Sequence, residues 1–246
     1  MSHAAFIVPD WPAPKGVRAV STLRQGGVSE GKYKGLNLGA HVGDDAQAVA
    51  TNRALLAQPP GPAARPRWLE QVHGCVAIAA DDWLPGIRAD ACVAMQHEQV
   101  CAVLTADCLP VLFCDEAGKC VAAAHAGWRG LLSGVLENTL MLMSAPSSRV
   151  LAWLGPAIGP TAFEVGDEVR AAFVGQAPDT QVFFAPNPAG RWQADLAGLA
   201  RHRLNRLGLD RVYGGEFCTA SDPARFFSYR RDGQCGRMAS MIWLDG

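Results

Sequence analysis

Apolar runs of strand length recur along this chain and are separated by turn-forming residues. The tetrapeptide DEAG between two of these runs, Val111 to Cys114 and Lys119 to Ala124, predicts a hairpin turn. The predicted strands cover residues 91–94, 100–104, 111–114, 119–124, 150–154, 182–184, 211–213 and 238–243. Strands that mostly follow one another in hairpins indicate mixed sheets and not a regular alternation of strand and helix.

Two segments have apolar residues at helical spacing instead. The first stripe follows Trp128 and runs from Leu131 to Leu140. The second runs from Leu196 to Leu207, with Asp195 as its N-cap and Gly208 as its stop. No G-x-G-x-x-G follows a strand, which disfavours a Rossmann fold. We therefore expect a mixed α/β (α+β) protein, with residues 1–246 forming a single layered domain of mixed β-sheets and flanking helices.

Composition narrows the class of ligand. The 246 residues are 49% hydrophobic and 18% charged, with a net charge of -1, so the length suits one sizeable core and the charge does not call for nucleic acid or an anionic membrane. The N-terminus lacks a basic segment followed by a long apolar one, and the most apolar stretch, around residues 100–114, is interrupted by Asp107 and Pro110. These features predict a soluble, cytoplasmic protein with a small-molecule ligand.

Cysteines are spread through the chain without a C-x-x-C pair. Most of the eight are expected to be reduced, because disulfides persist in oxidising compartments. Four lie in strand-like apolar runs, where a free cysteine is usually a small core residue: Cys92, Cys101, Cys114 and Cys120.

Three side chains in different motifs stand out as candidates for chemistry. They are His73 in QVHG, Cys108 in TADCLP and His125 in HAGWRG. We expect Cys108 at the end of a strand, where Pro110 limits further pairing, and His125 at the end of the next strand, before a helix. If the hairpin register brings these ends together, the thiol and imidazole form either a nucleophile pair or two ligands of a metal.

With His73 as a third ligand, the set would leave one tetrahedral position of zinc open, as in catalytic zinc sites. The spacing matches no general metal motif such as H-E-x-x-H, so a buried thiol beside two hydrogen-bonded histidines is the simpler interpretation of these residues alone. Among the other histidines, His3 and His97 are expected to be exposed, His202 lies in an arginine-rich helix, and His41 is near a glycine turn.

Two further segments could bind an anion. In TLRQGGVSEG, Arg24 precedes Gly26 and Gly27, whose backbone N–H groups could point at a phosphate. In FFSYRRDGQCGRMAS, Arg230 and Arg231 lie among aromatic residues and glycines, and an arginine fork suits phosphate or carboxylate. A plain hairpin loop and a solvated basic surface are the simpler interpretations of the two segments.

Taken together, these motifs resemble the bacterial YfiH family, whose members carry the labels laccase-domain protein, polyphenol oxidase, purine nucleoside phosphorylase and peptidoglycan editing factor. The resemblance extends along nearly the whole chain, through TLRQGGVSEGKYKGLNLGAHVGDD, WLEQVHG, RADACVA, LTADCLPVLF, HAGWRG, LGPAIGPTAFEVG and FFSYRRDGQCGRMAS. It implies a YfiH-like fold of one mixed α/β domain. It also implies that His73, Cys108 and His125 bind zinc and are the catalytic residues.

The activity implied by the resemblance is phosphorolysis of adenosine, inosine and S-methyl-5′-thioadenosine, with adenosine deamination as a second activity. Arg24, Gly26, Gly27, Arg230 and Arg231 are then the candidates for holding substrate and phosphate. The expected partners are a nucleoside and phosphate, with neither nucleic acid nor membrane, and the chain is expected to be a monomer.

Three other functions compete with this one. The first is a cell-wall editing hydrolase that removes a wrong amino acid from a UDP-muramoyl precursor, with Cys108 as nucleophile or with zinc-bound water. The second is a laccase-like, copper-dependent polyphenol oxidase. Six histidines with no His-x-His pair do not suit a multicopper centre, although copper(II) can replace zinc adventitiously at a single site. The third is a metal-dependent interaction module without catalysis.

Overall fold

The computed structural model describes residues 4–245, and within them a six-stranded sheet contains His125 and begins one of its strands directly after Cys108. Most neighbours in this sheet are antiparallel, and its two edge pairs are parallel. In spatial order its strands are β13 (Val212–Gly214), β9 (Val150–Leu154), β7 (Leu109–Asp115), β8 (Val121–Ala126), β5 (Ala91–Ala94) and β4 (Ala77–Ala79).

A second sheet has five strands and a third, smaller one has three. The five-stranded sheet is ordered β1 (Phe6–Ile7), β2 (Val17–Thr22), β14 (Met238–Leu244), β6 (Val100–Thr105) and β3 (Pro66–Arg67). The small sheet is ordered β10 (Glu164–Val165), β12 (Trp192–Ala194) and β11 (Phe184–Pro186). The C-terminal strand β14 lies between β2 and β6, so the two ends of the chain share one sheet.

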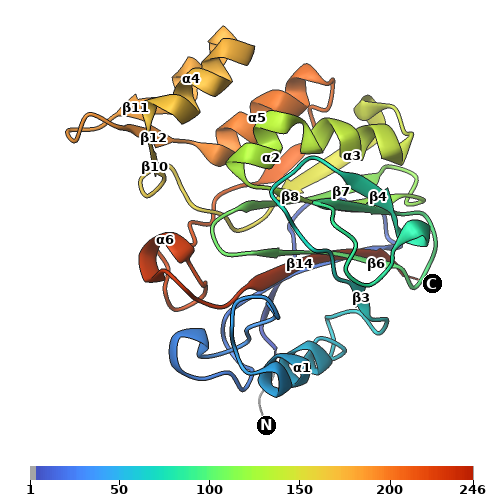
Figure 1. Ribbon diagram of the computed structural model, residues 1–246. Coiled ribbons are helices and arrows are strands. Elements are labelled where there is room, and N and C mark those ends of the chain that lie inside the picture. The colour runs from blue at the N-terminus through green and yellow to red at the C-terminus, as the bar shows by residue number, and fades with distance from the viewer. Residues whose placement is uncertain (1–3, 246) are drawn as a thin grey trace.

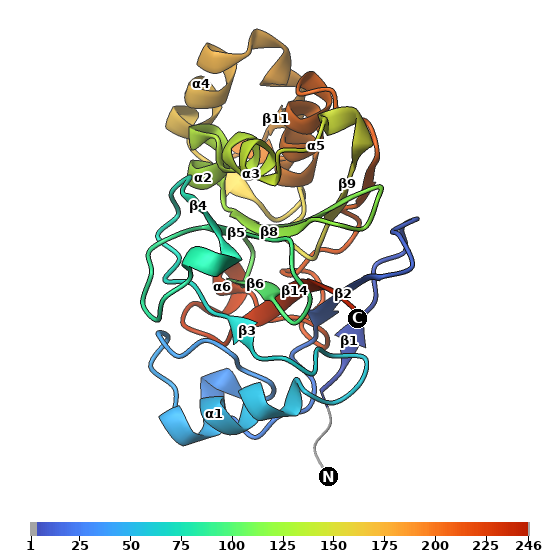
Figure 2. The same ribbon diagram turned by 90° about the vertical axis from the view of Figure 1, so that its right-hand side faces the viewer.

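The two larger sheets are stacked between helices (Figure 1). Helices α2, α3 and α5 cover the outer face of the six-stranded sheet, α1 lies beyond the five-stranded sheet, and α4 extends outward beside the small sheet (Figures 1 and 2). The α-helices are α1 (Ala46–Leu55), α2 (Trp128–Ser133), α3 (Val135–Met143), α4 (Asp167–Gln176), α5 (Leu196–Arg206) and α6 (Tyr229–Asp232). Short 3-10 helices are η1 (Gly31–Tyr33), η2 (Ala80–Asp82), η3 (Ser147–Arg149) and η4 (Pro178–Phe183).

Both faces of the six-stranded sheet are buried, which explains its continuous apolar strands. Along β7, Val111 and Phe113 pack with the helices, whereas Leu112 and Cys114 face the five-stranded sheet. This alternation follows from the two-residue period of a strand. Because each sheet is supported on both sides, the loops at the strand ends are attached to a rigid frame.

Several sequence predictions are confirmed. The fold is mixed α/β, Asp195 caps α5 through its bond from the Gly198 N–H, and Gly208 follows the helix end at a positive φ of 78°. In the DEAG turn, Asp115 Oδ1 accepts hydrogen bonds from the N–H groups of Lys119 and Cys120, both at 2.7 Å. All eight cysteines are free, and the four expected in the core are buried.

Other predictions were wrong in detail. The apolar stripe after Trp128 forms two helices, α2 and α3, because Gly134 adopts a φ of 96° between them. Residues 182 and 183 end the 3-10 helix η4, which starts at Pro178, so the predicted strand begins only at Phe184. Pro110 does not end strand pairing: it lies inside β7 opposite His125, and its carbonyl accepts a hydrogen bond from Gly155 N at 2.9 Å. Cys108 accordingly precedes β7 and does not terminate a strand.

The remaining positions agree with their expected environment or lie beyond the description. His97 is exposed, and His202 lies on α5 with its Nε2 3.3 Å from Asp179 Oδ2. His3 lies outside the described residues. Within residues 4–245, no helix combines the length and apolar character needed to cross a bilayer.

Candidate metal centre

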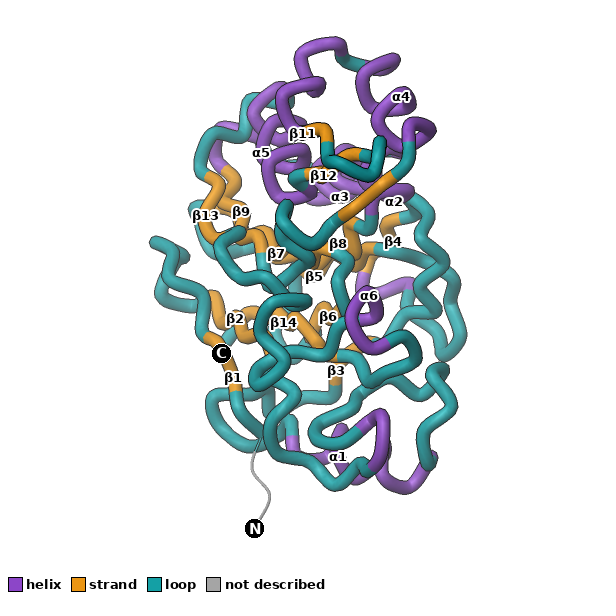
Figure 3. The backbone as a smooth tube through the Cα atoms, turned by 90° about the vertical axis from the view of Figure 1, so that its left-hand side faces the viewer, coloured by secondary structure: helices purple, strands orange, loops and turns teal. Residues whose placement is uncertain are grey.

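Strand register brings His73, Cys108 and His125 together. Cys108 lies in the turn between β6 and β7, and His125 is in β8. Because Pro110 pairs with His125 and Leu109 with Ala126, the start of β7 lies beside the end of β8. His73 comes from the loop between β3 and β4 and lines the same cavity as Tyr229 and Arg230 of α6. Figure 3 shows α6 on the side of the molecule that faces the viewer. The hairpin register thus brings Cys108 and His125 together, as the predicted site requires.

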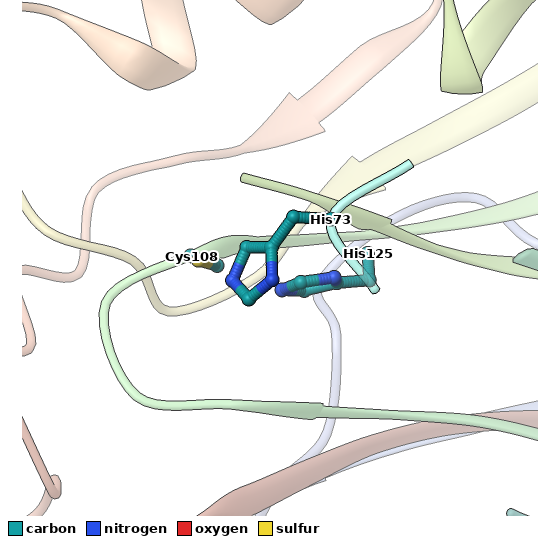
Figure 4. A group of neighbouring side chains, drawn as sticks. All are labelled: His73, Cys108 and His125. Atoms are coloured by element: carbon teal, nitrogen blue, oxygen red, sulfur yellow. The ribbon is translucent and has the colours of Figure 1, made fainter. Parts of the chain in front are cut away.

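The three side chains converge as ligands of one metal ion would (Figure 4). Their ligand atoms all lie within 4.8 Å of one another, and ligand atoms around a tetrahedral zinc ion lie roughly 3.5 Å apart. The rings of His73 and His125 meet edge to face, with centroids 4.9 Å apart. His125 is buried and His73 is exposed, so the cluster is open on one side. Among residues 4–245, no second set of three such ligands converges.

Asp90, which the sequence interpretation did not single out, holds two of the ligands. Its fully buried carboxylate accepts hydrogen bonds from His125 Nδ1 at 2.8 Å and from the His73 N–H at 3.0 Å, both at Oδ1. Its Oδ2 accepts from the N–H groups of Gly74 at 2.7 Å and Val72 at 3.3 Å. The bond to Nδ1 leaves Nε2 of His125 free to bind a metal, which is the usual role of a carboxylate behind a histidine ligand. The hydrogen bond from the His73 N–H to Asp90 also stabilises the left-handed backbone of His73, whose φ is 59°.

Two positions of HAGWRG must be glycine, because atoms of the metal cluster and its loop lie directly against their backbone. A Cβ on Gly127 would lie 2.9 Å from Cys108 Sγ and 3.3 Å from His73 Cδ2. A Cβ on Gly130 would lie 2.7 Å from the carbonyl oxygen of Gly74. Real Cβ atoms essentially never approach so closely, so these glycines let α2 start directly against the cluster.

Without a metal, Cys108 and His125 favour the charged pair. Burial raises the pKa of the Cys108 thiol, but the charge of His125 and the hydrogen bonds from His125 and His73 outweigh it and lower the pKa to about 6. Burial lowers the pKa of His125, but the Cys108 charge and the Asp90 hydrogen bond raise it to about 9. A thiolate at neutral pH is the form in which cysteine binds metals or acts as a nucleophile.

A cavity of about 320 Å³ opens beside the cluster. Its lining includes the aromatic residues Trp128, Phe163 and Tyr229 and the polar residues His41, Arg230 and Arg237. Apolar walls with a few convergent polar groups are typical of small-molecule sites. The remaining lining residues are Gln71, His73, Leu104, Thr105, Ala106, Asp107, Cys108, His125, Ile158 and Leu196.

Of the predicted anion-binding residues, only Arg230 lines this cavity. Arg24, Gly26 and Gly27 line a different hollow of about 710 Å³, and the Arg24 guanidinium lies over the Phe227 ring and donates to the carbonyls of Pro223 and Lys34. Arg231 pairs with Asp232 and donates to the carbonyls of Thr219, Ala220 and Phe226. Its guanidinium therefore fastens the loop before α6 and is not directed at the metal cluster.

Asp107 and Gln71 fix the walls around Cys108. Asp107, at a φ of 88°, accepts hydrogen bonds from Thr219 Oγ1 at 2.6 Å and from the Arg230 N–H at 2.7 Å, so it ties α6 to the Cys108 turn. The Gln71 side chain donates to and accepts from the backbone of Leu104, at 2.9 and 2.7 Å. Acidic residues directly beside buried strands are the signal that could have identified Asp90 and Asp107, since unpaired carboxylates are almost never buried.

Comparison with known proteins agrees with this geometry. The family described as multi-copper polyphenol oxidoreductase laccase matches residues 18–245. The chain is 53% identical over 242 residues to a purine nucleoside phosphorylase of Pseudomonas aeruginosa, with 98% of each chain covered. It is 51% identical to the purine nucleoside phosphorylase YfiH of Escherichia coli, covering 97% of this chain and 98% of that protein.

Solved structures match over the same extent. The structure of protein NMB0706 from Neisseria meningitidis superposes with a TM-score of 0.95 at 51% identity, covering 98% of this chain and 99% of that one. YlmD from Geobacillus stearothermophilus superposes with a TM-score of 0.88 at 31% identity, covering 96% and 94%. The resemblance expected from the motifs is confirmed, and together with the ligand cluster it implies a metal.

Proposed function

The chain belongs to the multi-copper polyphenol oxidoreductase laccase family, and from that premise we propose that it is a zinc-dependent purine nucleoside phosphorylase. Its substrates would be adenosine, inosine and S-methyl-5′-thioadenosine, with adenosine deamination as a second activity. The observation that carries the proposal is the convergence of His73, Cys108 and His125 in the lining of one cavity. Relatives that share about half of their residues with this chain are named for that activity.

Zinc suits the donor set. Two imidazoles and one thiolate are ligands that zinc prefers, and three protein ligands are typical of its catalytic sites. His73, Cys108 and His125 would hold the zinc ion, which would supply a Lewis acid beside the cavity. The chain's own part is to keep Cys108 deprotonated, to orient His125 through Asp90, and to leave one side of the cluster accessible through the exposed His73.

The cavity lining supports a purine nucleoside as substrate. Trp128, Phe163 and Tyr229 line the cavity, and Tyr229 is 59% exposed, so a planar base could stack against its ring. Arg230 and Arg237 also line the cavity, and their guanidinium groups suit an anion. A base and a phosphate are the two groups that phosphorolysis must hold at the same time.

One observation favours a second function, the cell-wall editing hydrolase. Cys108 with its depressed pKa beside His125 is also what a cysteine nucleophile requires. A thiol-dependent hydrolase should cleave a UDP-muramoyl amino acid after zinc has been removed, whereas the phosphorylase should be inactive without it. Multi-copper chemistry is less favoured, because the described residues bring together ligands for one ion, not for several.

The setting of the enzyme is also part of the proposal. We propose one domain, acting as a monomer in the cytoplasm on small molecules and without nucleic acid or membrane. Eight free cysteines suit a reducing compartment, and a net charge of -1 suits neither a polyanion nor an anionic surface.

The test is product analysis of zinc-loaded protein incubated with inosine, with and without phosphate. Phosphate-dependent release of hypoxanthine and ribose 1-phosphate is expected, and Cys108→Ala should lose both zinc and activity. Cys114→Ala is the matched control, because Cys114 is buried near the other end of β7 and should leave zinc binding intact. No release of hypoxanthine by zinc-bound wild-type protein would overturn the proposal for inosine.

A further inference from the structure

Two guanidinium groups at the cavity lack a carboxylate partner. Among the described residues, no carboxylate lies within 4.0 Å of the guanidinium nitrogens of Arg230 or Arg237, whereas Arg231 is paired with Asp232 and Arg225 with Asp222. An arginine left without a counter-ion beside a binding cavity is available to an anionic ligand.

The two arginines differ in which guanidinium N–H groups remain available for a ligand. Arg230 donates from Nη1 to the Ala162 carbonyl at 3.1 Å and from Nη2 to the Glu164 carbonyl at 2.9 Å. The hydrogen bonds of the Arg237 guanidinium within residues 4–245 all leave from Nη1, to the carbonyls of Cys235 at 2.9 Å and Gly236 at 3.1 Å and to Cys235 Sγ at 3.7 Å. The edge formed by Nε and Nη2 of Arg237 is therefore open, and such an edge can donate two parallel hydrogen bonds to an oxyanion.

The stem of Arg237 is held in place before any ligand arrives. Its N–H donates to the buried Asn37 Oδ1 at 2.8 Å, and its carbonyl accepts from the Leu38 N–H at 3.1 Å. Gly39 packs directly under the side chain, since a Cβ there would lie 2.8 Å from Arg237 Cγ. A fixed stem reduces the conformational entropy that binding would otherwise cost.

Arg237 lines the same cavity as the metal ligands. Arg237, His41, His73 and His125 all line it, and the Arg237 guanidinium lies 6.0 Å from the centre of the Tyr229 ring. Burial, then the charges of Arg237, Arg53, His125 and His73, lower the pKa of His41. His41, which lines the same cavity, is thus neutral at pH 7 and can still donate one hydrogen bond.

We propose that Arg237 binds the phosphate co-substrate through Nε and Nη2, next to the site of His73, Cys108 and His125. This inference rests on the proposed phosphorylase function. It assigns to Arg237 the role of principal phosphate ligand that the sequence analysis gave to Arg24 and Arg231. In the reaction, a phosphate oxygen forms a bond to the sugar carbon C1′ as the bond from C1′ to the purine nitrogen breaks. The electron pair leaves with the base, which takes up the proton that hydrogen phosphate gives up. Arg237 would hold the phosphate for this attack and balance its charge.

The experiment measures phosphate and inosine dependence separately in zinc-loaded Arg237→Gln and Arg237→Lys. For Arg237→Gln we expect the KM for phosphate to rise about tenfold or more, with the KM for inosine within about twofold of wild type and zinc content unchanged. Arg237→Lys retains the positive charge but not the two parallel N–H donors, so its KM for phosphate should lie between the values of wild type and Arg237→Gln. Arg18→Gln, which removes an exposed arginine paired with Asp245, is the control and should behave as wild type.

Direct binding of inorganic phosphate, measured by calorimetry on the zinc-loaded proteins, keeps the two proposals distinguishable. If wild type releases the base without needing phosphate, the phosphorylase proposal fails, but weaker phosphate binding by Arg237→Gln still supports this site. An unchanged phosphate KM and unchanged phosphate binding in both folded Arg237 variants would overturn it. So would an increase in the phosphate KM found in Arg24→Gln and absent from Arg237→Gln.

Discussion

Replacing Asp90 by asparagine tests whether this carboxylate builds the metal centre. Oδ1 serves His125 and His73, and Oδ2 serves Gly74 and Val72, so either orientation of the amide turns an NH2 group toward two N–H donors. A hydrogen bond to a charged group contributes about 1.5–3 kcal/mol, and the bond from Val72 to Oδ2, which is lost in one of the two orientations, is long at 3.3 Å. We therefore expect Asp90→Asn to lower the free energy of unfolding by about 2–4 kcal/mol.

Zinc binding should suffer as well, because the loop of His73 loses its anchor and the ring of His125 loses its charged partner. Loss of such a supporting group typically weakens metal affinity about 10–100-fold. Competition with a chelator of known affinity measures this change, and urea unfolding of the metal-free proteins measures the loss of stability. Asp115→Asn is the matched control, since that carboxylate also accepts two backbone N–H groups but at the other end of β7, through one oxygen that the amide retains.

The pH dependence of the unfolding free energy gives an independent check. Burial raises the pKa of Asp90, but hydrogen bonds from His125 and Gly74 outweigh it, and the pKa lies below the ordinary value. The stabilisation from Asp90 is therefore present above the unfolded pKa of about 3.9 and is lost as the pH falls through the lower folded value. Asp90→Asn should lack this acid-dependent loss. Zinc affinity within about twofold of wild type, together with unchanged unfolding, would refute the assignment.

Three further outcomes are expected from the same geometry. Gly127→Ala places a Cβ 2.9 Å from Cys108 Sγ and should weaken zinc binding about tenfold or more in the chelator assay, whereas Gly175→Ala in α4, whose Cβ meets nothing within 4 Å, should leave it unchanged. In metal-free protein, alkylation of Cys108 followed by peptide mass spectrometry should rise with pH with a midpoint of about 6, and a midpoint near 9 would contradict the charged pair. Chelation should lower Tm by about 5–10 °C, reversibly on adding zinc, because a ligand at about 100 times its Kd contributes about 2.7 kcal/mol; Cys108→Ala should show no such difference.

Much of the sheet framework could be predicted from local sequence. Strands with two buried faces are almost continuously apolar, and α5 has both a capping residue and a glycine stop, so its limits are encoded within a few residues. The wrong predictions of strand and helix limits arose at residues that are compatible with more than one local structure. Pro110 stops pairing in many strands, yet here it occupies the second position of β7, where its missing N–H is tolerated.

The candidate site shows the same division. His73, Cys108 and His125 could be selected because few residue types bind soft metals, and their motifs resemble one family along the whole chain. Arg24 and Arg231 could not be separated from Arg230 and Arg237 in this way, because every arginine carries the same charge in a sequence. Their hydrogen bonds decide: Arg231 is used by three backbone carbonyls and Asp232, and Arg237 keeps one edge open.

By itself the sequence determined the mixed α/β class, the buried strands and the three metal-binding candidates, because these depend on residue type and on spacing within one element. Only the tertiary structure decided that the start of β7 and the end of β8 meet, that Asp90 supports two ligands from separate segments, and which arginines reach the cavity. Such contacts join residues distant in the chain, and they are set by strand register and packing, which depend on the whole fold.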